Sequence, residues 1–76
     1  MQWDLDALRA LDAVVREGGF AKAAERLNKA QSAVSYQVRK LEQALGVALL
    51  DRSAYRATLT PAGELILSEA RRLLTQ

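Results

Sequence analysis

Apolar residues recur at helical spacing in four stretches of the chain, and the first stretch is typical of a helix that packs against a core. Asp4 can cap its amino-terminal end, and Gly18-Gly19 ends it. The spacing predicts a structural helix with one buried face. The apolar residues of that face are Leu5, Leu8, Leu11 and Val15.

Two more helices are predicted directly after the first. Residues 21–27 form a short amphipathic segment that ends at Asn28, a residue that tolerates the left-handed conformation. Residues 31–45 form a longer one, which Gly46 can close. Two helices joined by a tight polar turn, here within residues 20–39, are typical of a helix-turn-helix, whose second helix enters the major groove of DNA.

The polar face of the 31–45 helix carries candidate binding residues. At about 100° per residue, these side chains lie away from the apolar stripe, on its flank or in the first turn. They donate and accept hydrogen bonds, as the reading of base edges requires, and the central positions of the face hold no acid. We predict that this face contacts DNA, the alternative being an ordinary solvated helix surface. The predicted contacts are Gln31, Ser32, Ser35, Tyr36 and Arg39.

Residues 47–59 predict a β-hairpin, which we call the wing. Residues 47–50 are an apolar run too short for a helix, and residues 57–59 return as a second strand after a polar loop. Arg52 and Arg56 lie at the base and tip of this hairpin, where arginines can contact the DNA backbone or enter the minor groove. The alternative is that both arginines are only solvated.

A last helix is predicted to begin at Thr60-Pro61, a capping threonine followed by a proline at the first helical position. Its apolar residues cover more than one face, which exceeds what a helix at the edge of a small core needs. The surplus predicts a surface that pairs with a second copy of the chain. Because the helix is still apolar where the sequence ends, we also expect the chain to be a fragment. The predicted dimer residues are Leu65, Ile66, Leu67, Ala70, Leu73 and Leu74.

Positive charge is concentrated in the middle of the chain. The net charge is +2 overall, and it divides into −1 for residues 1–28, +3 for residues 29–56 and zero for the remainder. The excess therefore falls on the 31–45 helix and the wing. This placement suits a surface that faces phosphates, although a solvated helix face would carry the same charges.

Composition limits the other functions that the chain can have. Its 76 residues allow one small domain, and the absence of cysteine and histidine removes disulfides, thiolate chemistry and the commonest general base and metal ligand. We therefore expect no enzyme activity, no cofactor and no metal site. No apolar run is long enough to span a membrane, and the acidic start of the chain is unlike a signal peptide, so we expect a soluble cytoplasmic protein.

Leu5 and Leu8 of the first helix are followed by five sequence blocks that are specific in their order and spacing, and this pattern extends over nearly the whole chain. The blocks are Phe20-x-x-Ala-Ala-Glu-x-Leu27, Gln31-Ser-Ala-Val-Ser35, Gln37-Val-x-x-Leu-Glu42, Leu45-Gly-Val-x-Leu-Leu-x-Arg52 and Leu59-Thr-x-Ala-Gly63. Together these blocks resemble the N-terminal DNA-binding domain of the LysR-type transcriptional regulators, a large bacterial family.

The resemblance implies a mainly α-helical fold. Residues 1–59 would form a winged helix-turn-helix, with three helices and a two-stranded wing, and residues 60–76 a linker helix that pairs in dimers. It implies the same DNA contacts on the 31–45 helix, and it matches Arg52 to the wing arginine of the family and Arg56 to a basic position after it. A larger effector-binding domain, absent from this chain, would bind any small-molecule inducer.

The chain departs from the family pattern at several positions. Gly19 and Ala30 stand where serine commonly caps the two helices, and Ser32 stands where proline is common. Tyr36 replaces a frequent arginine, and Tyr55 falls where a basic residue is common. These departures leave the fold intact, but they bear on the preferred DNA sequence and point to fewer charge contacts.

The sequence as a whole predicts the DNA-binding domain of a bacterial transcriptional regulator. We expect a homodimer on an inverted-repeat operator in double-stranded DNA, with the 31–45 helix in the major groove and the wing at the flanking minor groove. The alternative function is a winged-helix module for protein–protein contact, which the modest net charge and the alanine-rich second helix permit.

Overall fold

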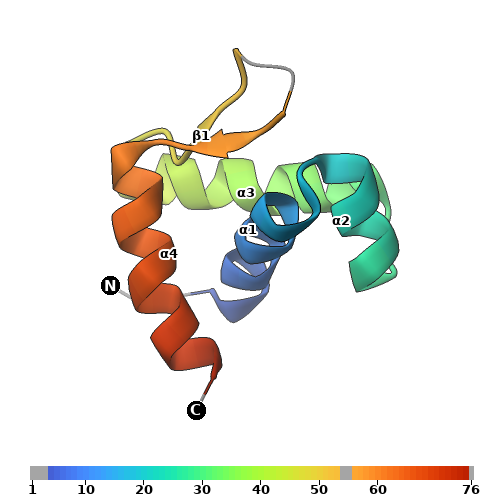
Figure 1. Ribbon diagram of the computed structural model, residues 1–76, viewed down its shortest axis with the longest axis horizontal. Helices are drawn as coiled ribbons and strands as arrows, with labels where there is room; N and C mark the ends of the chain where they lie inside the picture. Colours follow the sequence, from blue (N-terminus) through green and yellow to red (C-terminus); the bar gives the residue numbers. More distant parts are fainter. Residues whose placement is uncertain (1–3, 54–55, 76) are drawn as a thin grey trace.

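The computed structural model describes residues 4–53 and 56–75, and these residues form four helices and a two-stranded antiparallel sheet. In Figure 1, α1 lies in the middle, with α2 and α4 on either side of it, and the hairpin lies over α3. The predicted winged helix-turn-helix with a following helix is confirmed. In chain order the elements are α1 (Leu5–Glu17), α2 (Phe20–Leu27), α3 (Gln31–Leu45), β1 (Leu50–Asp51), β2 (Thr58–Leu59) and α4 (Pro61–Leu74).

Capping residues fix the ends of the helices. The Asp4 side chain accepts two backbone N–H groups at the start of α1, and the Thr60 hydroxyl accepts one at the start of α4. Asn28 closes α2 and Gly46 closes α3, both with positive φ, 56° and 70°. These caps agree with the predicted helix ends, except that α2 begins at residue 20 instead of 21.

Burial of α1 extends well beyond the single face that the sequence predicts. The helix packs against α2, α3 and α4, and its alanines are buried together with its large apolar residues. Leu5, which belongs to the predicted stripe, is instead exposed. The spacing of the large residues was misleading because small residues bury the other sides of the helix. The buried residues of α1 are Ala7, Leu8, Ala10, Leu11, Ala13 and Val14.

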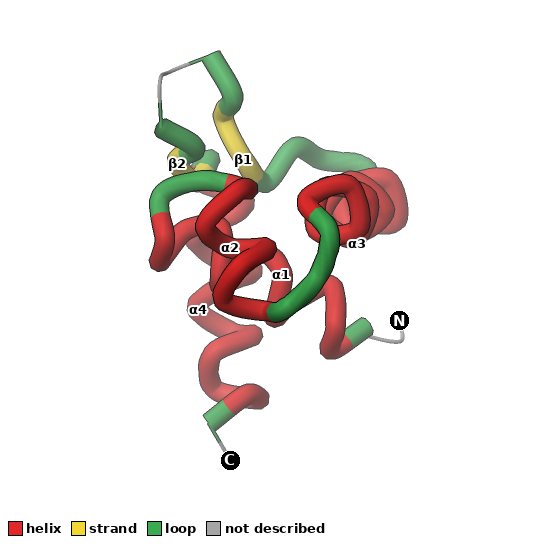
Figure 2. Tube along the Cα trace, turned by 90° about the vertical axis from the view of Figure 1, so that its right-hand side faces the viewer, coloured by secondary structure: helices red, strands yellow, loops and turns green. Residues whose placement is uncertain are grey.

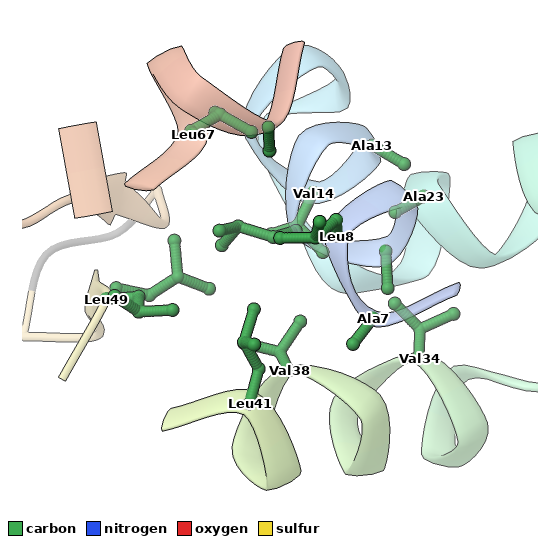
Figure 3. Packing of buried hydrophobic residues seen from close by; sticks show 14 of the residues in the cluster. Ala7, Leu8, Ala13, Val14, Ala23, Val34, Val38, Leu41, Leu49 and Leu67 are labelled. Carbon is green, nitrogen blue, oxygen red and sulfur yellow. The ribbon is translucent and has the colours of Figure 1, made fainter. Parts of the chain in front are cut away.

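Side chains from every other part of the fold converge on α1. In Figure 3, Val38 and Leu41 of α3 lie on one side of Leu8, Leu67 of α4 lies on another, and Leu49, just before β1, closes the core. Full burial of one such side chain stabilises a fold by about 1.5–3 kcal/mol. This packing holds the apolar face of α3 inward, so its polar face must point away from the core.

The position of α4 corrects part of the predicted dimer surface. Leu67 and Ala70 are each 1% exposed, because the face of α4 that carries them packs into the core of the same domain. They are therefore unavailable to a second copy of the chain. Leu65 and Leu73 remain exposed, at 67% and 47%, and two further predicted residues are half-buried, Ile66 and Leu74.

A carboxylate between two arginines ties α4 to α1. One oxygen of Asp12 accepts a hydrogen bond from Nε of Arg71, 59 residues further along the chain, at 2.9 Å. The other oxygen accepts Nε of Arg16, one turn away on α1, at the same distance. The ion pair adds a polar contact between α1 and α4 to the apolar packing of α4 on the core. Among the described residues, no helix is long and apolar enough to cross a membrane.

The wing is shorter than predicted. Its ladder pairs Leu50 with Leu59 and Asp51 with Thr58, so the first strand begins at residue 50 instead of 47. Val47 is exposed, and the N–H of Leu49 is bonded to a side chain instead of a strand. The hairpin lies at the α3 end of the molecule, and the carboxyl end of α4 lies at the opposite end (Figure 1, Figure 2).

We expect Gly63→Ala to destabilise the domain, although alanine is the better helix former. A Cβ at Gly63 would collide with the carbonyl oxygen of Leu49 and lie 2.9 Å from Cδ2 of Leu59. Overpacking of this kind costs about 1–3 kcal/mol, which urea denaturation followed by circular dichroism would measure. Ser68→Ala, at an exposed position of α4, is the control and should leave stability nearly unchanged. Equal stability of the Gly63 variant and the wild type would contradict this packing.

Candidate nucleic-acid interface

The predicted contact residues of α3 come together on one outward strip. Gln31, Ser32, Tyr36 and Arg39 are exposed, and Ser35 is half-buried. Tyr36 is 61% exposed, which is unusual for a large aromatic side chain in a folded domain. One guanidinium nitrogen of Arg39 donates to Oγ of Ser35 at 3.4 Å, a weak bond that leaves its other donors available.

The first turns of α2 and α3 have no side-chain caps. Gly19 and Ala30 occupy the capping positions, and neither makes a side-chain hydrogen bond to its helix. The first backbone N–H groups of each helix therefore depend on water or a ligand for their hydrogen bonds. Gly19 and Ala30 lie where the resemblance leads one to expect a capping serine, so its absence here is a property of this chain.

A basic groove separates the start of α2 from the wing. It has a volume of about 860 Å³, and its basic lining side chains are Lys22, Arg52 and Arg56. Gln31, in the first turn of α3, lines the same groove. The acidic side chain in its lining, Glu17, is paired with Arg26 of α2 at 3.7 Å. The groove thus presents a net positive surface beside the polar strip of α3.

Arg52 lies directly after β1, at the base of the wing, where the sequence predicts it. One of its guanidinium nitrogens lies 3.2 Å from a carboxylate oxygen of Glu42 on α3. The guanidinium carbon is 5.6 Å from the centre of the Phe20 ring at the start of α2, within the range of a cation–π contact. Arg52 therefore joins three parts of the domain, and its side chain is directed by those contacts.

Glu42 is the residue that sequence reasoning missed. Its side chain is only 11% exposed, and Oε2 accepts the backbone N–H groups of Leu49 at 2.8 Å and Leu50 at 3.2 Å. Glu42 is therefore an acceptor held against the core side of the wing, and not an ordinary solvated charge. No direct signal for it is present in the sequence, because the need for an acceptor arises only when the ladder begins at residue 50 and leaves the N–H of Leu49 outside it.

Arg56 is placed by the end of α1. Its guanidinium lies so close to Gly18 that a Cβ at that glycine would collide with it. Gly18 is the carboxyl-terminal cap of α1, where the helix dipole is negative and stabilises a cation. This contact holds Arg56 at the edge of the basic groove. Tyr55, the departure predicted beside it, lies outside the described residues.

The wing loop begins with a turn held by one carboxylate. Oδ1 of Asp51 accepts the Ser53 hydroxyl at 2.5 Å and the Ser53 backbone N–H at 2.9 Å. These two bonds favour the charged form, and they lower the pKa of Asp51 below its ordinary value of 3.8. The bonds order the residues that lead into the tip of the wing.

Comparison with known proteins agrees with this architecture. Residues 5–64 match the family of bacterial regulatory helix-turn-helix proteins, lysR family. The chain is 49% identical over 70 residues to the uncharacterized HTH-type transcriptional regulator YeeY of Escherichia coli (strain K12), an alignment that covers 92% of this chain and 23% of YeeY. The chain thus spans about a quarter of the length of this relative.

Solved structures with the same fold include complexes with DNA. The BenM_DBD/catB site 1 DNA complex aligns with a TM-score of 0.92 and 40% identity, covering 96% of this chain and 82% of that one. The CbnR_DBD–DNA complex aligns with a TM-score of 0.89 and 40% identity, covering 96% and 84%. The chain belongs to the lysR family of bacterial regulatory helix-turn-helix proteins. It is a DNA-binding domain of that family, whose members are transcriptional regulators and not enzymes.

We expect Ser53→Ala to raise the pKa of Asp51 toward its ordinary value, since the hydroxyl is the largest cause of the lowering. The backbone bond remains, so the return will be partial. A folded-state pKa below the unfolded value favours folding above the unfolded pKa, and this contribution disappears as pH falls through the folded pKa. An NMR titration of the carboxyl carbon measures the shift, with Ser68→Ala as control. An unchanged Asp51 pKa would contradict the turn.

Proposed function

We propose that this domain reads a specific operator sequence through α3 in the major groove, with the wing against the flanking minor groove. The observation that carries the proposal is the polar strip of α3, which the core packing turns outward beside a basic groove. Base edges are read by side chains that donate and accept hydrogen bonds, and the strip offers hydroxyl, amide and guanidinium groups. The predicted base-reading residues are Gln31, Ser32, Ser35, Tyr36 and Arg39.

Phosphate contacts would supply most of the affinity. Lys22 and Arg56 line the basic groove, and the uncapped first turns of α2 and α3 offer backbone N–H groups beside it. Neutralising phosphates releases counterions, so affinity should fall steeply as salt rises. The BenM and CbnR domains have this fold and were solved in complex with DNA, which supports the same partner here.

The arrangement also supports a homodimer on an inverted repeat. Leu65 and Leu73 are exposed leucines two turns apart on α4, on the side that the core leaves uncovered. Pairing through α4 would relate two copies by a two-fold axis, and each copy would present its α3 to one half-site. Binding of a small-molecule inducer would belong to a domain outside this chain, and the site of action would be the bacterial cytoplasm.

Arg39→Ala should weaken operator binding by about 10- to 100-fold, the cost of losing one good base or phosphate contact. The measurement is fluorescence anisotropy with a labelled duplex at fixed salt. Arg9→Ala removes the same charge from α1, where Arg9 pairs with Asp6 at 3.7 Å, and should change affinity little. Unchanged DNA affinity of the Arg39 variant would refute the assignment of α3 and favour a protein-interaction module.

Replacing Leu65 or Leu73 by glutamate should weaken self-association by about tenfold or more, because a charge would replace an apolar contact at the pairing surface. Sedimentation equilibrium of the wild type and the variants measures the effect. Leu5→Glu, at an exposed leucine of α1, is the matched control. A wild-type chain that stays monomeric at high concentration, or variants that associate as well as it does, would contradict pairing through α4.

A further inference from the structure

A single carboxylate connects the recognition helix α3 to the base of the wing. Glu42 accepts backbone N–H groups of Leu49 and Leu50 through one oxygen, at 2.8 and 3.2 Å, and a guanidinium N–H of Arg52 through the other, at 3.2 Å. Bonds to an ionised acceptor are about twice as strong as neutral ones. All three bonds cross from α3 to the segment that leads into the wing.

The same carboxylate directs Arg52 toward a second helix. Arg52 lines both the basic groove beside α2 and a smaller one, of about 380 Å³, at the carboxyl end of α3. Arg52 therefore borders both grooves, and its guanidinium lies over the Phe20 ring and beside Glu42. Residues of α2, α3 and the wing meet at this one point.

An acid in this place works against the electrostatics of DNA binding. Glu42 lies only three residues from Arg39, and its negative charge is repelled by phosphates. Its side chain is only 11% exposed, so the three bonds must offset a cost of desolvation. A net gain for binding can therefore come only through the geometry that Glu42 imposes on other groups.

We propose that Glu42 is a positioning residue of the DNA interface, and that it fixes the wing relative to α3 through Arg52 and the amides of Leu49 and Leu50. The polar strip and the wing then approach DNA as one rigid unit. Arg52 accordingly acts within the domain, as the link between Glu42 and Phe20, more than as a contact to DNA. This inference rests on the proposed function.

The decisive variant is Glu42→Gln. Its side-chain oxygen can still accept the backbone amides, whereas its NH₂ group cannot accept the Arg52 donor. Loss of a negative charge alone would strengthen DNA binding. Loss of positioning should instead weaken DNA binding by about tenfold. Selection from random duplexes should then show a relaxed base preference in the flank under the wing, while the preference in the major groove is retained. Glu25→Gln, at an exposed position of α2, removes the same charge and should not weaken binding.

Thermal unfolding of each variant, measured beside the binding assay, shows whether the domain is folded at the assay temperature. If Glu42→Gln fails to fold, Arg52→Lys decides, because it keeps the charge but loses the guanidinium fork. Arg52→Lys should relax the same flank preference. Where both single variants fold, the double variant should bind DNA no more weakly than either single variant. Three results would overturn the inference. One is equal or tighter DNA binding by Glu42→Gln with an unchanged preference in the flank. The others are an unchanged flank preference of Arg52→Lys, or a double variant whose loss of affinity is the sum of the two single losses. Absence of binding by the wild type would instead overturn the proposed function.

Discussion

Packing of α1 against three other helices is the constraint on which the rest of the structure depends. Because Ala7, Ala10 and Ala13 are small, α2, α3 and α4 can all approach the same helix closely. Each neighbour must then turn one apolar face inward, and for α3 that face is the row that includes Val34 and Val38. The outward direction of the polar strip is a consequence of this packing.

Two half-buried carboxylates complete what apolar packing leaves free. Leu49 and Leu67 already pack the wing segment and α4 into the core, and polar bonds add to this packing at both places. Glu42 holds the wing through backbone amides and Arg52, while Asp12 holds α4 through Arg71. The geometry of the proposed DNA interface thus combines a nonspecific apolar core with a few specific polar bonds.

Local signals in the sequence predicted the helices well, and long-range contacts explain what they did not predict. Caps such as Thr60 and Gly46 act within a few residues, so the helix ends followed from spacing. The burial of Leu67 depends on where α4 docks, and the bonds of Glu42 depend on a segment beyond Gly46. Neither is encoded in helical periodicity. The polar strip was predictable because the apolar and the polar face of α3 lie on the same helix, so the position of one gives the other. Which residues of the strip contact DNA remains a prediction.

The most direct test of the account is selection of bound duplexes from a random pool with the wild-type chain, at low and near-physiological salt. We expect an enriched sequence that forms an interrupted inverted repeat, with affinity that falls as salt rises. Such a result would establish reading by α3 and the paired geometry together. No binding at either salt concentration, or binding that neither enriches a sequence nor responds to salt, would contradict the account.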